Sequence, residues 1–331
     1  MNRIPRRDVL LRVAVLPLAA ACLLGTATLA SAQAWPVKPI RLIVGYPSGS
    51  SPDVQARLIA EPLSRALGQP VVVDNKPGAS GNIGAELIAK SDDGHTIGVI
   101  GNGPLTSSRF LYARLPYDPL KDFAPIALIG SAPLVWAVAK SPSSGAADSY
   151  VRQARAEGDK LAYGSVGPGS GGHLGMELLK PALGINPLHV PFNGGPPILN
   201  AMMGGQVQMT LLPASTVMPL VQAGKIDAIA VTSAKRSPLA PTLPAMEELG
   251  ANGVNIEVWN AVMAPASMPA AHQARLVAEM DKILSSREMR QKLFVQGWKV
   301  DETSARSLAQ RIRSDTAIYQ AVIERNKIKI D

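Results

Sequence analysis

Residues 40–53 read IRLIVGYPSGSSPD, and residues 54–67 continue as VQARLIAEPLSRAL. The first five residues are a β-branched and apolar run, and the continuation repeats apolar residues at helical spacing. The joint between them is rich in glycine, serine and proline, the residues of turns and helix starts. This stretch is therefore predicted to form a strand, a tight loop and a helix.

The same alternation of strand and helix continues along most of the chain. Alternating units of this length predict parallel sheets with helices on both faces, which is an α/β fold. The expected strands are 40–46, 71–75, 95–101, 123–130, 133–139, 160–166, 187–192, 206–212 and 226–233, and the expected helices are 52–67, 82–90, 150–157, 173–180, 197–203, 217–223, 271–285, 287–296 and 305–326.

A second joint of the same kind, YGSVGPGSGG, occupies residues 163–172. In an open α/β sheet, ligands bind beyond the carboxyl ends of the strands, where the following helices direct unpaired N–H groups at the opening. Glycine lets a ligand approach the backbone closely, and serine adds a hydroxyl. Two such joints facing each other could hold both ends of a small anionic molecule without arginine or lysine.

A purely structural interpretation of the first joint also fits the sequence. Ser51 can cap the helix, Pro52 suits its first position, and Asp53 complements the helix dipole. Asp53 as a general base would lack a paired acid or nucleophile nearby, which favours a role in ordering the loop.

Enzymatic interpretations find less support in the sequence. Gly167, Gly169 and Gly172 match a dinucleotide fingerprint, but no acidic residue follows Glu177 until Asp227. Phosphate-loop and nucleophile-elbow motifs are absent from the sequence, and the four histidines lack metal-ligand spacing. We therefore expect no catalytic residue, no cofactor and no metal.

The amino terminus has the features of an export signal. Residues 1–32 combine a basic start, an apolar run and the cleavage-type sequence Ala30-Ser31-Ala32, and Arg6-Arg7 also fits a twin-arginine pattern. They contain Cys22, the single cysteine, so the exported chain has no disulfide. Their four arginines and one aspartate carry +3 of the net charge of +8, which leaves +5. Because this charge is spread along the chain, it argues against nucleic acid as a partner. The export signal leads us to expect a periplasmic protein.

From about Trp35 onward, the chain resembles the substrate-binding proteins of tripartite tricarboxylate transporters, the Bug family. The resemblance lies in six segments in family order: WPVKPIRLIVGYPSGSSPDVQAR (35–57), VVVDNKPGASGNIGAELIAKSDDGHTI (71–97), LPYDPLKDFAPIALIG (115–130), YGSVGPGSGGHL (163–174), HVPFNGGPPILNAMMGGQV (189–207) and GKIDAIAVTSAKRSPLAPTLPAMEELG (224–250).

The resemblance implies a two-lobed periplasmic-binding-protein-like fold with a ligand cleft between two α/β sandwich lobes. Lobe 1 would comprise residues 35–135 and 252–331, and lobe 2 residues 136–251. A small carboxylate would be captured by hinge closure and delivered by a monomer to a two-component membrane permease. The implied ligand-binding residues are Tyr46, Ser48, Gly49, Ser50, Ser51, Asp53, Ala79, Ser80, Ser165, Gly169, Ser170, Gly171, His173, Phe192 and Asn193.

Two departures from the family pattern bear on the ligand. Ser50 stands where the family usually has a second glycine, and Phe192-Asn193 stands where Tyr-Lys is common. The second change removes a phenol and a positive charge, which favours an aromatic or other less polar organic acid over a tricarboxylate. Two alternatives remain open at this point, a ligand-sensing component for a signalling receptor and a periplasmic enzyme.

Overall fold

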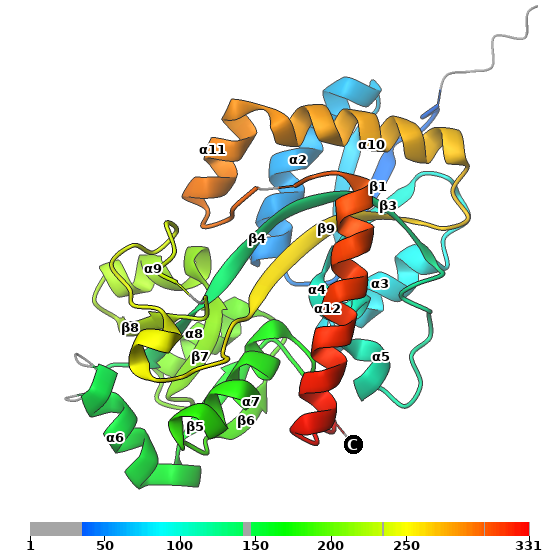
Figure 1. Ribbon diagram of the computed structural model, residues 1–331. Helices are drawn as coiled ribbons and strands as arrows, with labels where there is room; N and C mark the ends of the chain where they lie inside the picture. The colour runs from blue at the N-terminus through cyan, green and yellow to red at the C-terminus, as the bar shows by residue number, and fades with distance from the viewer. Residues whose placement is uncertain (1–34, 142–146, 234, 301, 331) are drawn as a thin grey trace, which may run out of the picture. The chain divides into compact units, whose positions relative to one another are not determined.

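The computed structural model describes residues 35–141, 147–233, 235–300 and 302–330, and the chain from Lys38 onward forms one compact unit (Figure 1). The expected export signal at residues 1–32 lies outside the described ranges. Among the described helices, none has the length and apolar character needed to cross a membrane.

The first of two connected sheets has three parallel strands at one edge. Its strand order is β2-β1-β3-β9-β4, and β1 pairs in parallel with both β2 and β3. Helices cover it, and their apolar faces join the strands in a core that includes Ile43, Ile88 and Trp259. The elements are β1 (Ile40–Val44), α2 (Ser51–Leu67), β2 (Val71–Asn75), the 3₁₀ turn η1 (Ala79–Gly81), α3 (Asn82–Ala89), β3 (Thr96–Gly101), α4 (Asn102–Leu105), α5 (Ser108–Leu111), β9 (Glu257–Pro265), α10 (Ala270–Ser285) and α11 (Arg287–Val295).

The second sheet is built from the middle of the chain. β5 pairs in parallel with β6 and β7, whereas β7 and β8 pair with β4 in the antiparallel sense. Its elements are α6 (Ala147–Glu157), η2 (Gly158–Lys160), β5 (Ala162–Ser165), α7 (Gly171–Leu183), β6 (Leu188–Pro191), α8 (Gly195–Met203), β7 (Met209–Pro213), α9 (Ala214–Gln222), β8 (Ile226–Val231) and η3 (Met246–Leu249).

Strand β4 (Phe123–Ala139) belongs to both sheets. It pairs with β9 as far as Pro133, and from Leu134 onward it pairs with β7 and β8. The prediction of two separate strands here was wrong. Proline weakens a strand signal because it cannot donate to the ladder, yet this strand continues through Pro125 and Pro133, with register shifts in its pairing with β9.

Strand β9 was not predicted, and it changes the expected sheet type. It runs antiparallel to both β3 and β4, so the sheets are mixed rather than parallel. In Figure 1, β4 and β9 lie side by side as the two chain crossings between the sheets.

Thr232 ties the two crossings together. Its backbone N–H donates to Leu134 O at 2.8 Å, and its hydroxyl accepts from Leu134 N at 2.8 Å. The same hydroxyl donates to Ile256 O at 2.6 Å, and Ile256 N donates to Thr232 O at 3.0 Å. This buried cluster fixes the point where β4 changes partners, directly before β9 begins.

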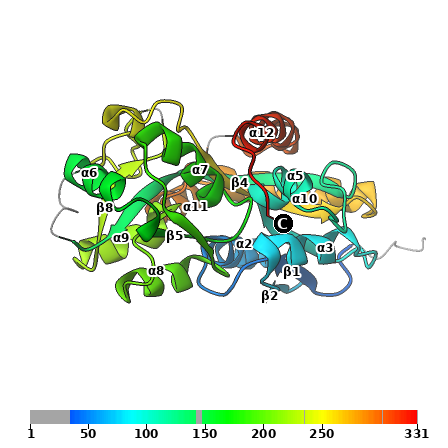
Figure 2. The same ribbon diagram turned by 90° about the horizontal axis from the view of Figure 1, so that it is seen from below.

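The last helix, α12 (Ala305–Arg325), contributes to both halves of the core. Leu308 and Ile312 belong to the cluster under the first sheet, whereas Tyr319 and Ile323 belong to a cluster on the second sheet. Figure 2 shows α12 nearly end-on beside α7 and α5. The α/β, two-lobed fold class is confirmed, and the lobe boundaries stay a prediction.

We expect Thr232→Val to lower the free energy of unfolding by about 3 kcal/mol, because a buried N–H and a buried carbonyl lose their partner without any change of side-chain shape. Urea unfolding measures this loss. Thr316→Val is the matched control, since its hydroxyl bonds only to the helical carbonyl of Ile312. Equal stability of the two variants would contradict the assigned role of Thr232.

Candidate functional site

A cavity with a volume of about 80 Å³ lies where loops of both sheets meet. None of these lining residues carries a charge. They are Tyr46, Ser50, Ser51, Pro52, Gly101, Asn102, Gly103, Leu134, Val166, Ser170, Gly171, Gly172, Gly194, Gly195, Pro196, Leu211, Leu212, Pro213, Thr216, Val258, Asn260 and Trp298.

The amino ends of four of the longer helices contribute to this wall. These are α2 at Ser51, α7 at Gly171, α8 at Gly195, and α9 through Pro213 and Thr216. Only α7 among these four has a side-chain cap, in which Ser170 Oγ accepts from His173 N at 3.3 Å. The first-turn N–H groups of a helix have no partner within the helix, and together with the dipole they attract an anion.

Asp53 shapes the first loop from behind the cavity. Its carboxylate accepts from Gly49 N at 2.8 Å and from Asn75 Nδ2 at 2.9 Å, and Arg57 donates to both of its oxygens. Gly49 has a φ of 79°, a left-handed conformation that favours glycine. Burial acts to raise the pKa of the Asp53 carboxyl, but the bonds from Arg57, Gly49 and Asn75 outweigh it and hold the pKa below its ordinary value.

The second loop is supported by an aromatic stack in which Tyr163 and His173 are buried and His189 is half-buried. His173 lies on His189 with ring centres 4.3 Å apart, and His189 lies on Tyr163 at 4.9 Å. Gly169 N donates to His173 Nδ1 at 3.1 Å, and Ser165 Oγ is 2.7 Å from His189 Nε2. Both histidines therefore shape the loop that ends at α7.

Burial keeps these two histidines neutral. It lowers the pKa of His173 to about 4, against the opposing effect of Glu177. It lowers the pKa of His189 to about 3, and the neighbouring His173 and Lys180 act in the same direction. A neutral His173 can accept the Gly169 N–H, whereas a protonated ring could not.

The two sides of the cavity touch directly. Ser51 Oγ lies 3.1 Å from Thr216 Oγ1, and Ser107 Oγ donates to Gly169 O at 2.6 Å. Gly167 has a φ of 114°, which favours glycine, and a Cβ at this position would lie 2.1 Å from Ser80 Oγ, so a larger residue would also force Ser80 to move. The arrangement is one in which the loops of the two sheets have closed on each other.

The residues predicted to bind a ligand fall into two groups. Tyr46, Ser50, Ser51, Ser170 and Gly171 line the cavity. The others lie beside it or behind it, and their ligand contacts stay a prediction. They are Ser48, Gly49 and Asp53 in the first loop, Ala79 and Ser80 in η1, Ser165, Gly169 and His173 in the second loop, and Phe192 and Asn193 after β6.

Within this second group, Ser80 and Phe192 have identifiable structural partners. The Tyr46 hydroxyl donates to Ser80 O at 2.9 Å, which ties η1 to the first loop, and burial raises the pKa of that phenol. Phe192 packs against the core of the second sheet, whereas Asn193 is exposed.

Four polar or aromatic cavity residues were not predicted. Asn102 starts α4, Thr216 lies in the first turn of α9, Asn260 belongs to β9, and Trp298 follows α11. Asn102 directly follows a predicted strand, a position that could have identified it. Asn260 had no such signal, because its strand was itself not predicted.

Groups of three or more potential metal ligands do not occur among His, Cys, Asp and Glu of the described ranges. The cavity wall itself offers hydroxyls, carboxamides and backbone N–H groups, which suit hydrogen bonding to an organic molecule.

Comparisons with known proteins agree on one family. Residues 55–328 match the model described as "Tripartite tricarboxylate transporter family receptor". The protein BugT of Bordetella pertussis is 35% identical over 243 residues, which cover 73% of this chain and 74% of BugT.

Two similar solved structures come from Rhodopseudomonas palustris. Rpa4515 with adipate has a TM-score of 0.86 and 33% identity, and the match covers 89% of this chain and 100% of that one. MatC with bound malate has a TM-score of 0.82 and 28% identity, covering 87% and 100%.

We expect acid to destabilise this chain through the histidine pair. The pKa of His173 is lower in the folded chain than its ordinary 6.5, so the unfolded chain takes up the proton first. This contribution is present above pH 6.5 and falls by on the order of 3 kcal/mol as the pH drops to about 4.

Urea unfolding between pH 4 and pH 7.5 measures this dependence, with His173→Asn as the comparison. Asparagine keeps an acceptor for Gly169 N–H but does not titrate, so the variant should show a flatter stability profile. Identical slopes for the two proteins would rule out a contribution from His173.

Proposed function

This chain belongs to the tripartite tricarboxylate transporter receptor family of solute-binding proteins, and we propose that it captures a small organic acid in the cavity described above. In this proposal the acid is bound unchanged and passed to a membrane transporter. The observation that supports it most directly is that the amino ends of four helices meet at one cavity, whose lining residues in the described part of the chain carry no charge.

A carboxylate suits this wall for an electrostatic reason. Burying an anion is costly unless hydrogen-bond donors replace its water. Backbone N–H groups in the first turns of α2, α7, α8 and α9 supply such donors, apart from the prolines Pro52, Pro196 and Pro197, which have none. The Ser51 and Thr216 hydroxyls add to them. A neutral wall binds an anion by dipoles and hydrogen bonds, and it leaves no buried cation when the ligand departs.

The apolar part of the wall suits the body of the acid. Leu134, Leu211, Val258 and Trp298 line it, and none of these side chains carries a positive charge that could pair with an additional carboxylate. The solved relatives hold adipate and malate, both small carboxylates. We therefore favour a compact mono- or dicarboxylate with an aliphatic or aromatic body over a tricarboxylate.

Capture would proceed by closure of two lobes, with lobe 1 at residues 35–135 and 252–331 and lobe 2 at 136–251. The crossings at Leu134 and Ile256 support this division, because the chain changes sheets there. A ligand favours the closed form only if it binds that form more tightly. Contacts from both α2 and α7 would exist together only in the closed form and would supply this difference.

Six of the remaining predicted ligand-binding residues would also hold the loops, and the other four, Ala79, Ser80, Phe192 and Asn193, would line the walls of the cleft. Asp53 with Ser48 and Gly49, and His173 with Ser165 and Gly169, hold the two loops in shape. Export by a cleaved signal at residues 1–32, a monomeric state and a two-component permease partner complete the proposal. No catalytic step is part of it.

The proposal is tested by calorimetric titration of the purified chain with malate, succinate, adipate, benzoate and citrate. We expect one-to-one binding of at least one mono- or dicarboxylate and recovery of the acid unchanged. At about 100 times its dissociation constant, such a ligand adds about 2.7 kcal/mol of stability. Conversion of the acid, or binding of citrate alone, would contradict the proposal. A separate experiment distinguishes transport from sensing: a strain that lacks this protein should lose uptake of the acid if the protein serves a transporter.

Thr216→Val tests the closed arrangement. We expect about fivefold weaker binding of the acid found above, because the hydroxyl bond to Ser51 across the cavity is lost while the shape is kept. Titration calorimetry measures the affinity. Thr303→Val, whose hydroxyl bonds to Asp281 in exposed surroundings, should bind like the parent chain. Unchanged affinity of Thr216→Val would argue against a role of this contact in capture.

A further inference from the structure

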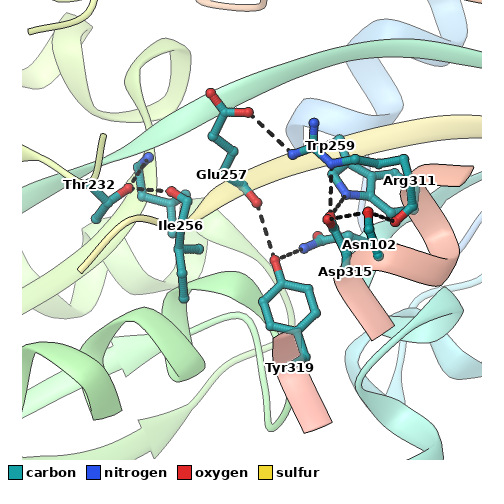
Figure 3. A network of polar contacts seen from close by, with 10 residues as sticks. Asn102, Thr232, Ile256, Glu257, Trp259, Arg311, Asp315 and Tyr319 are labelled. Carbon is teal, nitrogen blue, oxygen red and sulfur yellow. Dashed lines mark hydrogen bonds and ion pairs between the residues drawn. The ribbon is translucent and has the colours of Figure 1, made fainter. Parts of the chain in front are cut away.

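Tyr319 on α12 reaches the cavity wall through Asn102 (Figure 3). Asn102 Nδ2 donates to the Tyr319 hydroxyl at 2.8 Å, and that hydroxyl lies 3.3 Å from the carbonyl oxygen of Glu257, to which it donates. Asn102 and Tyr319 are 5% and 4% exposed. One buried hydroxyl thus joins a cavity-lining residue to the first residue of the crossing strand β9.

The face of α12 that carries Tyr319 is fastened to β9. Asp315 Oδ2 accepts from Trp259 Nε1 at 2.6 Å and from Arg311 Nε at 2.9 Å, and Arg311 Nη2 donates to Glu257 Oε2 at 3.2 Å. Arg311, Asp315 and Tyr319 are four residues apart, so they share one face of the helix. Tyr319 is therefore held in position by two further links to the same strand (Figure 3).

The proton of the Tyr319 hydroxyl determines how Asn102 is oriented. A phenol has one proton to donate, and the Glu257 carbonyl can only accept. The hydroxyl therefore meets Asn102 as an acceptor, which requires the NH₂ side of the carboxamide. Asn102 Oδ1 then points away from Tyr319. Among the described residues it accepts no hydrogen bond from a side chain or a backbone group, although Asn102 lines the cavity.

We propose that Tyr319 is a positioning residue that makes Asn102 present its carbonyl oxygen, an acceptor, to the bound acid. This inference rests on the proposed function and narrows its substrate class. An acid that carries a hydrogen-bond donor, such as a hydroxyl beside its carboxylate, gains a bond to Oδ1. An acid whose only polar atoms near Asn102 Oδ1 are hydrogen-bond acceptors gains no such bond.

Matched acids separate this effect from general binding strength. Malate differs from succinate, and 2-hydroxybenzoate from benzoate, by a single hydroxyl. Calorimetry gives the affinity ratio within each pair for the parent chain, Tyr319→Phe and Tyr150→Phe. Tyr150 is the control because its buried hydroxyl also donates to a carbonyl, that of Gln208 at 3.2 Å, in the second sheet.

We expect the parent chain to prefer the hydroxylated member of at least one pair by about fivefold, the effect of one hydrogen bond. Tyr319→Phe frees Asn102 to turn and should bring the ratio near one, whereas Tyr150→Phe should keep it. A uniform loss of affinity for both members would leave the ratio unchanged, and it would indicate structural damage in place of a positioning role. A ratio unchanged in Tyr319→Phe, or a parent chain that prefers the unsubstituted acids, would overturn the proposal.

A ligand-free measurement keeps this inference separate from the proposed function. If none of the four acids binds and adipate does not bind either, the proposed ligand class fails, but the side-chain amide of Asn102 still reports its orientation by NMR. We expect one Nδ2 proton of Asn102 to exchange slowly with solvent in the parent chain and in Tyr150→Phe. In Tyr319→Phe we expect the same proton to exchange fast. Fast exchange in the parent chain would overturn the positioning role.

Discussion

Unpaired backbone N–H groups at the start of a helix require a partner, and this fold brings four such helix starts to one cavity. The arrangement explains why the cavity wall needs no arginine or lysine. It also explains the composition of the loops, since serine and glycine leave the backbone open to a ligand where larger side chains would cover it. The charged groups nearby serve another purpose, as Asp53 and Arg57 show by fixing the first loop from behind.

The convergence of the helices depends on two strands that cross between the sheets. β4 serves both sheets, and β9 closes the first sheet against it. Because Leu134 and Val258 lie on these strands and line the cavity, the floor of the cavity and the connection between the lobes are the same structure. Thr232 fixes the crossing from one side, and α12 packs along it from another. In the proposed closure, movement of the lobes would therefore change the cavity directly.

Much of this site follows from local sequence. The two joints between strand and helix identified Ser51, Ser170 and Gly171, because a tight turn followed by a helix start has its own residue chemistry. Asp53 was also expected to order its loop, in agreement with its hydrogen bonds to Gly49 and Asn75.

The remaining part of the site depends on pairing between distant residues. β9 contains Asn260, two alanines and a methionine, so its strand propensity is modest, and its partners lie more than 100 positions earlier. Asn102 and Tyr319 are 217 positions apart, and no local pattern indicates that they meet. The single long strand β4 was hidden by its prolines, whose cost is outweighed by the partners that three other strands supply.

The central claim is that an acid is bound by neutral donors at the helix amino ends, and a crystal structure of the chain with the acid that binds tests it most directly. We expect the carboxylate in the cavity, with its oxygens within hydrogen-bond distance of backbone N–H groups at the starts of α2 and α7. A carboxylate paired with a lysine or arginine at another place, with the cavity holding only water, would contradict the account.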